Sequence, residues 1–284
     1  MEEQFLKTLS SYQKKIEKEI RRFFDRKIKK TKQPLLRSYF KLLKEFSLRP
    51  AKRIRPILIN QGYLLAGGKN KGEILRTSIF IELIHNYLLI HDDIIDRDKI
   101  RRGGPTVHHY YRGGHYGESM AVVIGDLASS LGYEILTSSR FPANYRIRAA
   151  EKLNQVLSFT CYGQLLELSL LKKKKKTKKD VIEIYRNKTA NYTFVGPLQI
   201  GAILAGANER FLKKIEKFSL PLGIAFQIKD DILDAEPGID KQPQKLAEKL
   251  IKQSKKVLEN ERNFPRKEKQ FLSALAEYII NRNV

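Results

Sequence analysis

Apolar residues recur along the chain at spacings of three and four, and alternating strand-like patterns are scarce. Such periodicity is typical of amphipathic helices. Breaks at Pro and Gly, as at Gln33-Pro34 and Gly67-Gly68, separate the helical segments. The pattern predicts an all-α fold in a single domain spanning residues 1–284. The expected helices cover residues 2–30 (as one helix or two), 35–46, 54–66, 73–96, 119–136, 144–171, 180–205, 211–235, 245–260 and 267–281.

The most apolar segment runs from Ile79 to His91 and is hydrophobic on most of its faces. A helix of that kind belongs at the centre of a bundle, where every face is covered. The sequence therefore predicts a helical bundle around this helix.

The 284 residues are 42% hydrophobic and 30% charged, which is typical of a soluble globular protein. One cysteine, Cys161, excludes an intramolecular disulfide and a cysteine-based zinc cluster. It agrees with a reducing, cytoplasmic location, and we interpret it as a packing residue rather than a nucleophile. No stretch approaches the roughly 18 apolar residues of a membrane span, so we expect no integral membrane protein. The acidic start, Met1-Glu2-Glu3, is unlike a secretory signal.

Lys and Arg number 55 against 31 Asp and Glu, which gives a formal net charge of +24. Such a surface attracts polyanions: nucleic acid, anionic lipid or phosphorylated small molecules. We expect no nucleic-acid binding, because the sequence has no zinc finger, Gly-rich RNA-binding signature or basic zipper. Peripheral contact with a membrane stays open. Part of the excess is a lysine run at residues 172–179, which we interpret as a solvated loop.

The expected central helix ends in three carboxylates, Asp92, Asp93 and Asp96. Asp92 and Asp96 are one helical turn apart and share a face, where like charges repel. They also lie at the C-terminal end of the helix, where the macrodipole disfavours anions. Three carboxylates in such a place need a positive partner.

A second cluster has the same spacing and also closes an apolar helix: Asp230, Asp231 and Asp234. Two such helices side by side would present six carboxylates across one cavity. Mg²⁺ suits them, because it takes one or two carboxylates per ion and fills its shell with water and substrate phosphate oxygens. Solvated helix ends are the alternative, and two clusters of identical spacing make that reading the weaker one.

Basic residues accompany the clusters. Lys52-Arg53-Ile54-Arg55-Pro56 opens a helix, where backbone N–H groups and the dipole favour a phosphate. Arg101-Arg102 follows the first cluster by one loop, and Lys188-Thr189 falls mid-chain on a helix. Each alone is more often surface charge than a site. Together with the carboxylates, they indicate a site for highly charged phosphate groups.

With these motifs in order, the chain resembles the trans-isoprenyl diphosphate synthases, or polyprenyl synthetase family, of the short-chain type. The match runs from about Lys52 to Asp234. The motifs that carry it are Lys52-Arg53-Ile54-Arg55-Pro56, Glu82-Leu83-Ile84-His85 with the first cluster, Arg101-Arg102-Gly103, Gly125-Asp126, Gly163-Gln164, Lys188-Thr189-Ala190 and Phe226-Gln227-Ile228 with the second cluster.

The resemblance implies an all-α fold around a deep central cavity, and a homodimer. It also implies head-to-tail condensation of isopentenyl diphosphate with an allylic diphosphate, by Mg²⁺-assisted ionisation. The implied metal ligands are Asp92, Asp96 and Asp230, with Asp93, Asp231 and Asp234 completing the first and second shells. The residues implied to hold the allylic diphosphate are Arg101, Lys188, Thr189 and Gln227. Those implied to hold isopentenyl diphosphate are Lys52, Arg55, His85 and Arg102. The expected catalytic set is Asp92, Asp93, Asp96, Asp230, Arg101 and Lys188.

Product length in this family depends on bulk beside the helix of the first cluster. Tyr87 and Leu88 lie five and four residues before Asp92, about one turn deeper. The bulky Tyr87 therefore predicts a C20 product, with C15 next. The other interpretation is that Tyr87 is simply part of the core.

The chain departs from the family in three places. Pro50-Ala51 stands where Gly-Gly is usual, and Glu167 stands where Asp is common. The segment after Asp234 is also short: a phosphate-binding lysine is expected there, and Lys241 or Lys245 could substitute.

These departures keep alternatives open. The main one is a non-catalytic or partner-dependent subunit, although retention of all six aspartates favours the enzyme. A nucleic-acid or membrane-surface binder would lose affinity steeply with salt and ignore Mg²⁺. Head-to-head condensation and terpene cyclisation are disfavoured, since neither needs a pocket for isopentenyl diphosphate.

Overall fold

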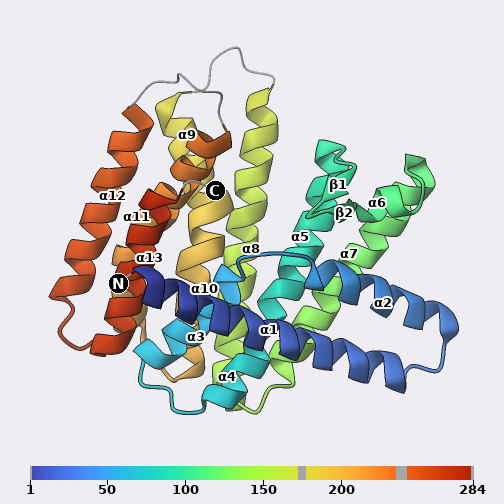
Figure 1. Ribbon diagram of the computed structural model, residues 1–284, viewed down its shortest axis with the longest axis horizontal. Coiled ribbons are helices and arrows are strands. Elements are labelled where there is room, and N and C mark those ends of the chain that lie inside the picture. Colours follow the sequence, from blue (N-terminus) through green and yellow to red (C-terminus); the bar gives the residue numbers. More distant parts are fainter. Residues whose placement is uncertain (1, 172–176, 235–241, 283–284) are drawn as a thin grey trace. The chain divides into compact units, whose positions relative to one another are not determined.

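The computed structural model describes residues 2–171, 177–234 and 242–282, and within them the all-α prediction is confirmed (Figure 1). The strands of this part are β1 (Ile100–Arg101) and β2 (Gly104–Pro105), which pair as one antiparallel hairpin. Of the predicted solvated loop at residues 172–179, residues 172–176 lie outside the described residues. Lys178 and Lys179 are exposed but begin the helix α9 (Lys178–Ile184), so for them the loop prediction is wrong. Residue 241, the first candidate for the missing lysine, also lies outside the described residues, whereas Lys245 lies on a helix.

The chain divides into two compact units. The N-terminal unit comprises Leu9–Ile57 and Lys71–Arg140, and the C-terminal unit comprises Met1–Thr8, Leu58–Asn70 and Phe141–Val284. A single domain around a deep central cavity stays a prediction.

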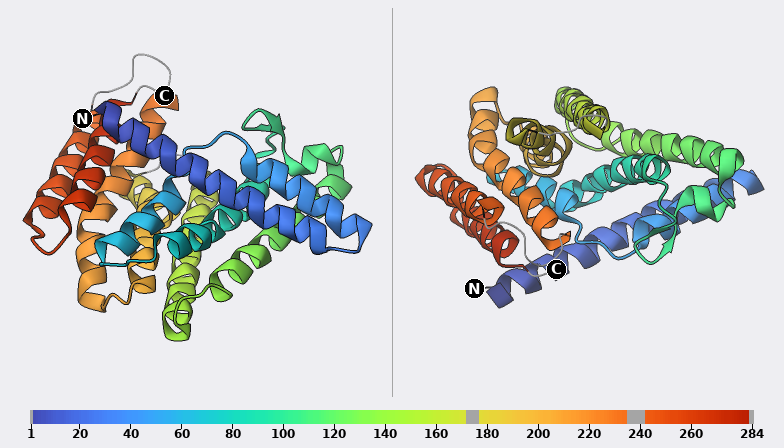
Figure 2. Two further views of the ribbon diagram at one scale, coloured as in Figure 1. Left: turned by 60° about the horizontal axis from the view of Figure 1, so that its bottom comes forward. Right: turned by 90° about the horizontal axis from the view of Figure 1, so that it is seen from above.

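The N-terminal unit is built around an apolar helix, α5. From Phe80 to Asn86 every residue of α5 is buried, as its hydrophobic faces predict. Helix α7 packs closely on it at Gly132, where an added Cβ would lie 2.9 Å from Ile84 Cδ1. Figure 2 shows α2 alongside α1, with Lys44 of α2 paired to Asp25 of α1 at 2.5 Å. The helices are α1 (Glu2–Lys30), α2 (Pro34–Leu48), α4 (Lys71–Ser78), α5 (Phe80–Asp96), α6 (Val107–Tyr110) and α7 (Gly114–Thr137).

The C-terminal unit has α10 at its centre, because every residue from Gly196 to Leu204 is buried. Its backbone touches that of α3: a Cβ on Gly201 would lie 2.0 Å from the carbonyl oxygen of Ile59. Only glycine allows helices to approach so closely. The helices are α3 (Ile54–Leu65, of which Leu58 onward belongs to this unit), α8 (Ala143–Leu171), α9 (Lys178–Ile184), the π-helix η1 (Tyr185–Val195), α10 (Gly196–Leu204), α11 (Glu209–Asp234), α12 (Gln242–Asn260) and α13 (Arg266–Asn281).

Two predicted helices prove to be interrupted. The helix expected over residues 73–96 breaks at Ile79, where the Ser78 hydroxyl donates to the Leu75 carbonyl at 2.9 Å and competes with the helical ladder. The helix expected over 180–205 contains η1. Gly196 N–H bonds the carbonyl of Asn191, five residues back, and Pro197 has no N–H with which to restore the α-helical spacing.

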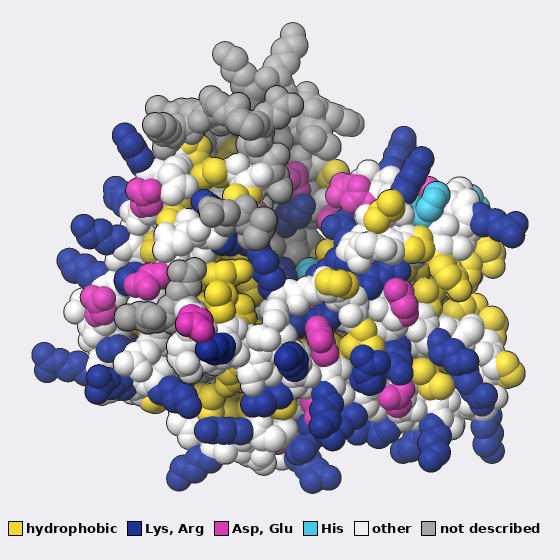
Figure 3. Space-filling view, viewed as in Figure 1, with side chains coloured by type: hydrophobic (Ala, Val, Ile, Leu, Met, Phe, Trp, Pro, Cys, Tyr) yellow, Lys and Arg dark blue, Asp and Glu magenta, His cyan; other side chains and the backbone are white. Residues whose placement is uncertain are grey.

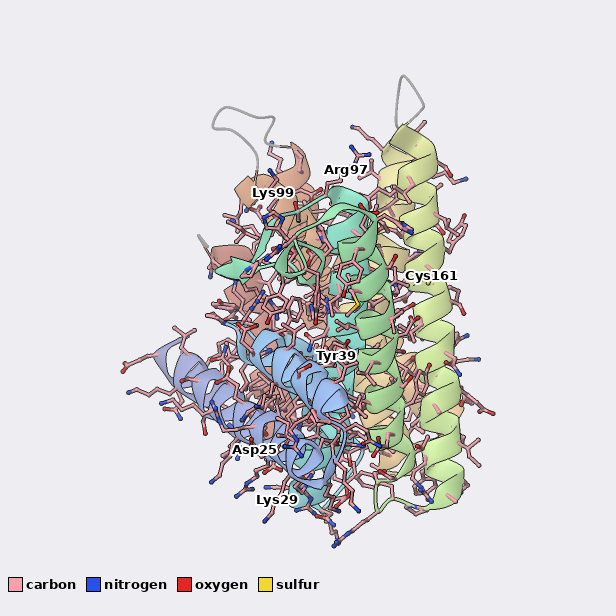
Figure 4. The ribbon with its side chains drawn as sticks, turned by 90° about the vertical axis from the view of Figure 1, so that its right-hand side faces the viewer. Asp25, Lys29, Tyr39, Arg97, Lys99 and Cys161 are labelled. Atoms are coloured by element: carbon pink, nitrogen blue, oxygen red, sulfur yellow. The ribbon has the colours of Figure 1, made fainter. Side chains whose placement is uncertain are left out.

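Two smaller expectations are wrong. Cys161 is exposed on α8 and is not a packing residue (Figure 4). Helix α7 is long and apolar enough, by length and composition, to cross a membrane, although no such stretch was expected. The apolar window of α7 is 44% buried, and core helices pass the same test.

Candidate active site

The loop after α2 closes without glycine. Pro50 and Ala51 both avoid positive φ, and the left-handed conformation falls on Arg53, with φ 54°. Gln13 on α1 holds this loop by donating to the carbonyls of Ala51 and Lys52, at 3.5 and 3.1 Å. Pro50-Ala51 is therefore compatible with an ordered loop, in which Arg53 carries the positive φ.

The side chain of Arg53 is fully buried, and its ion pair with Glu82 of α5 spans 2.7 Å. Glu82 is only 3% exposed, so each charge is compensated by the other. Arg53 also donates to the Arg49 carbonyl at 2.8 Å and approaches Glu17 of α1 at 3.4 Å. Glu82 was not predicted to be a functional residue. Its position in the sequence could have indicated this ion pair, because a Glu within an otherwise apolar helix requires a buried cation.

One turn after Glu82, His85 meets two guanidinium groups. Its Nε2 lies 3.1 Å from Arg55 Nη1 and 3.5 Å from Arg102 Nη2. Burial, followed by the positive charges of Arg55, Arg102, Arg53 and Arg101, holds the pKa of His85 well below its ordinary value of 6.5. The imidazole is therefore neutral at physiological pH. Arg55, His85 and Arg102, here called the arginine pocket, are three of the four residues predicted to hold isopentenyl diphosphate. Lys52, the fourth of these residues, is half-buried in the loop between α2 and α3.

Arg102 reaches the pocket from the tip of the β1–β2 hairpin. Arg102 and Gly103 have φ of 50° and 78°, as a two-residue primed turn requires. Burial is the main cause that lowers the pKa of Arg102 to about 10, and nearby Arg53, Arg55 and Arg101 lower it further, against the opposing effect of Glu82. Its Nη1 is buried and has no hydrogen-bond partner among the described residues. A buried, unused donor among like charges fits an anionic ligand.

The three carboxylates of the first cluster differ in burial and in their partners. Asp93 is fully buried, and its Oδ1 accepts from Arg101 Nε at 2.6 Å. Burial is the main cause that raises the pKa of Asp93 to about 6, although Arg101 opposes the shift. Asp92 is half-buried and Asp96 exposed. Figure 4 marks Arg97 and Lys99 in the turn that carries the chain from α5 to the hairpin. Asp93 thus positions Arg101, while Asp92 and Asp96 are accessible to a cation.

The second cluster, in the C-terminal unit, is engaged by the chain's own side chains. Asp230 pairs with Arg282, whose guanidinium lies 4.4 Å from the ring centre of Phe226. Asp231 accepts from the Tyr185 hydroxyl and, at 2.8 Å, from Gln227 Nε2. Burial and the bond to Asp231 raise the pKa of Tyr185. Asp234 closes α11, and its side chain lies outside the described part.

Next to this cluster, η1 places two further predicted residues. Thr189 Oγ1 donates to Gln227 Oε1 at 2.7 Å, and Lys188 Nζ pairs with Glu167 at 2.5 Å. The contact of α8 with η1 depends on Gly163, where a Cβ would lie 2.6 Å from Lys188 N. Glu167, the residue that departs from the family pattern, is therefore the counter-ion of Lys188. Tyr185 and Arg282 were not predicted as site residues. Only their contacts with Asp231 and Asp230 in the structure show that they belong to the second cluster.

The residues predicted to govern product length lie on α5. The Tyr87 ring packs edge-on against His91, with ring centres 4.7 Å apart. His91 in turn lies over Gly125 of α7, where a Cβ would come within 2.6 Å of its Nε2. Tyr87 and Leu88 are both half-buried, so neither is simply core.

The predicted site residues thus fall into two groups. The N-terminal unit holds Lys52, Arg55, His85, Tyr87, Leu88, Asp92, Asp93, Asp96, Arg101 and Arg102, and the C-terminal unit holds Lys188, Thr189, Gln227, Asp230, Asp231 and Asp234. Contacts within each unit join His85 to Arg55 and Arg102, Arg101 to Asp93, and Gln227 to Thr189 and Asp231. Their roles in binding and catalysis stay predictions.

The donor chemistry of both clusters fits Mg²⁺. Within residues 2–171, 177–234 and 242–282, no three acidic, histidine or cysteine side chains gather as a closed metal cage. Carboxylates are instead offered in pairs, by Asp92 and Asp96 and by Asp230 and Asp231, of which the second pair would have to exchange its internal bonds for the metal. That is the donor set of an ion that takes one or two carboxylates and completes its shell with water and phosphate.

Comparison with known proteins agrees with this geometry. The family model for polyprenyl synthetases matches residues 37–255. A geranylgeranyl diphosphate synthase of Methanosarcina mazei is 34% identical over 186 residues, which cover 64% of this chain and 54% of that protein. A farnesyl diphosphate synthase of Geobacillus stearothermophilus is 34% identical over 206 residues, covering 67% of this chain and 64% of that one. The aligned part of the chain thus spans little more than half the length of these curated relatives.

The fold is shared with solved structures over nearly the whole chain. The geranylgeranyl pyrophosphate synthase of Corynebacterium glutamicum, complexed with isoprenyl diphosphate and magnesium, superposes with a TM-score of 0.86 at 23% identity, covering 96% of this chain and 99% of that one. An apo FPP/GFPP synthase of Zymomonas mobilis gives a TM-score of 0.80 at 26% identity, with 96% and 99% covered.

Proposed function

The chain belongs to the polyprenyl synthetase family, and on that premise we propose that it is a trans-prenyltransferase. It condenses isopentenyl diphosphate head-to-tail with an allylic diphosphate to give a short-chain prenyl diphosphate. The observation that carries the proposal is the arginine pocket. There, two guanidiniums converge on a neutral His85, and Arg102 retains a buried donor that no described residue uses.

In this proposal the arginine pocket binds the diphosphate of isopentenyl diphosphate. Arg55, Arg102 and Lys52 supply positive charge, and burial strengthens each charge-assisted bond. Neutral His85 adds a hydrogen-bonding group without repelling the arginines. Holding this substrate still supplies the proximity that makes the carbon–carbon bond-forming step fast.

The allylic diphosphate must lose its C–O bond, which leaves negative charge on the departing diphosphate. Bound Mg²⁺ supplies Lewis-acid stabilisation of that charge. Asp92, Asp96 and Asp230 would hold the metal, and Asp93 would keep Arg101 in place. The side chains proposed to hold the diphosphate are Arg101, Lys188, Thr189 and Gln227. No side-chain nucleophile is required, and by family analogy the released diphosphate takes the final proton.

We propose a C20 product, with C15 the alternative. The support is Tyr87, a bulky side chain fixed against His91 and placed one turn before Asp92. A rigid aromatic ring at that depth would stop the growing apolar tail.

Helix α7 supports a homodimer. Tyr116, Val122 and Val123 are 66%, 42% and 66% exposed along it, an apolar surface that a second copy of the chain would cover. Size-exclusion chromatography with light scattering tests this, and a monomer at micromolar concentration argues against it.

We also propose a cytoplasmic protein with peripheral membrane contact. Figure 3 shows Lys and Arg side chains across the face that carries α1 and α2. Exposed Lys14, Lys18, Arg21 and Lys29 recur on α1, and Leu35 nearby is 66% exposed. Basic residues beside an exposed apolar side chain suit an anionic lipid surface. Sedimentation with phosphatidylserine vesicles tests this contact, and failure to co-sediment at low salt contradicts it.

The deciding experiment is a product assay on the purified chain. It contains labelled isopentenyl diphosphate, Mg²⁺ and, separately, C5, C10 and C15 allylic primers, followed by chain-length analysis. A C20 or C15 product supports the enzyme. A folded protein that binds diphosphate but makes no product with any primer supports the partner-dependent subunit instead.

A further inference from the structure

We propose that Arg49, at the end of α2, is a positioning residue for the arginine pocket. It sets the spacing between the loop that leads into Arg55, in the first turn of α3, and the hairpin that carries Arg102. The inference rests on the proposed function, because isopentenyl diphosphate is taken as the ligand of this pocket.

Several contacts hold the guanidinium of Arg49 in one position. Its side chain is 6% exposed. Nε and Nη2 donate to the two carboxylate oxygens of Glu45 at 3.0 and 2.9 Å, and the group lies 4.8 Å from the ring centre of Phe46. A bidentate pair stacked on an aromatic ring fixes both the position and the plane of a guanidinium.

The remaining donor, Nη1, joins both strands of the hairpin. It donates to the carbonyl of Arg101 on β1 at 3.1 Å and to that of Pro105 on β2 at 3.0 Å. The tip between these strands is Arg102 and Gly103, both with positive φ, a conformation that is strained for Arg102 alone. A two-strand hairpin of this length is not stable alone. Arg49 therefore holds the turn from which Arg102 reaches His85.

The backbone of Arg49 reaches the other wall of the pocket. Its carbonyl accepts from Arg53 Nη2 at 2.8 Å, and Arg53 is paired with Glu82, one turn before His85 on α5. The loop that leads into Arg55 is thus tied, through Arg53, to the residue that holds the hairpin. Arg55 and Arg102 repel one another, so this rigid support is what keeps both beside the same imidazole.

A glycine on the hairpin points to the same role independently. An added Cβ on Gly104 would lie 2.7 Å from both Cζ and Nη2 of Arg49. Gly104 does not have a positive φ, so its backbone does not require glycine. The absence of a side chain at Gly104 makes room for the Arg49 guanidinium.

The test compares Arg49→Lys and Gly104→Ala with wild type. Lysine at position 49 keeps the positive charge but cannot form the planar, bidentate pair with Glu45. Alanine at position 104 displaces the guanidinium of Arg49. We expect both variants to weaken binding of isopentenyl diphosphate alone about tenfold by calorimetry, since a misplacement near 1 Å can cost more than that. The KM for isopentenyl diphosphate should rise in parallel. The KM for the allylic primer and kcat should stay near wild type, because Asp93 and Asp98 hold the side chain of Arg101 independently of Arg49.

Arg22→Lys is the matched control, because Arg22 makes a helical ion pair with Glu19 at 2.7 Å but contacts neither loop nor hairpin. It should bind like wild type. Where Arg49→Lys does not fold, Glu45→Gln provides the same readout through a milder change, the loss of the charge that orients Arg49.

Two results overturn the inference. One is unchanged affinity for isopentenyl diphosphate in folded Arg49→Lys and Gly104→Ala. The other is an equal loss for both substrates, which signals a general structural role. Wild-type protein that binds no isopentenyl diphosphate at all contradicts the proposed function itself, so the two failures are distinguishable.

Discussion

The arginine pocket of the N-terminal unit and the second carboxylate cluster of the C-terminal unit balance their charges in opposite ways. Around His85, the guanidiniums of Arg55 and Arg102 are brought together, and Glu82 is paired with Arg53. In the second cluster, each described carboxylate has a protein donor: Arg282 on Asp230, and Tyr185 and Gln227 on Asp231.

The difference shows where binding has to rearrange the protein. A pocket that places two guanidiniums beside a neutral imidazole, with Arg102 Nη1 buried and unused by the described residues, is prepared for an anion and needs little movement to receive it. A cluster whose carboxylates already accept internal bonds must give those up when a metal arrives. We therefore expect substitutions in the pocket to act on affinity through geometry, and substitutions around the second cluster to act through competition.

The largest effect is expected at the first cluster. Asp92→Ala should lower turnover at least about a thousandfold, because it removes a ligand of the metal that stabilises the departing diphosphate. The fold should survive, since Asp92 is half-buried near the end of α5. Product formation and circular dichroism check both points, with Asp25→Ala on α1 as the active control. Near-wild-type turnover in Asp92→Ala would remove the metal-site proposal.

The second-largest effect is expected at the buried ion pair of Arg53 and Glu82. Glu82→Ala leaves Arg53 buried without its partner and should lower the free energy of unfolding by about 3–5 kcal/mol. Glu209→Ala breaks the exposed pair with Arg148, where Glu209 is 74% exposed, and should cost at most about 1 kcal/mol. Urea denaturation measures both, and equal losses would show that the Arg53–Glu82 pair has no special structural role.

The neutral imidazole gives a pH signature. The pKa of His85 is well below 6.5 in the folded protein, so the unfolded chain takes up a proton that the folded chain does not. The free energy of unfolding should therefore fall as pH drops below about 6.5, by up to about 1.4 kcal/mol per pH unit from this group. His85→Gln should flatten that part of the curve. Parallel pH profiles for the two proteins would rule this contribution out.

The smallest effect is expected at the second cluster. Arg282→Met frees Asp230 from an internal cation and should raise Mg²⁺ affinity about fivefold, the scale of a partly exposed ion pair. Arg266→Met is the control, because Arg266 is exposed at the start of α13, the helix that Arg282 follows. This substitution should leave the Mg²⁺ affinity unchanged. Calorimetric titration with Mg²⁺ alone measures the difference. Weaker or unchanged binding in Arg282→Met would show that Arg282 does not compete with the metal.

Most helices follow from the sequence because an apolar stripe has only one way to be buried. The interruptions of two of these helices do not follow from the sequence. The break at Ile79 and the π-helix η1 depend on local hydrogen bonds, from Ser78 and around Pro197, which leave the hydrophobic period almost unchanged. Within the site, Arg55, His85 and Arg102 stand out by residue type and order, whereas Arg49 and Tyr185 do not, because their only signal is contact with residues distant in sequence.

The sequence by itself determined the fold class, the family and the order of the charged motifs, since periodicity and residue type are properties of the chain. Tertiary structure alone decided how those charges are compensated. Asp93 is buried under Arg101 while Asp92, its neighbour, stays accessible, and Glu167 meets Lys188 across two elements. Burial and pairing are set by distance in space, and the energy of a charge depends on both far more than on its place in the sequence.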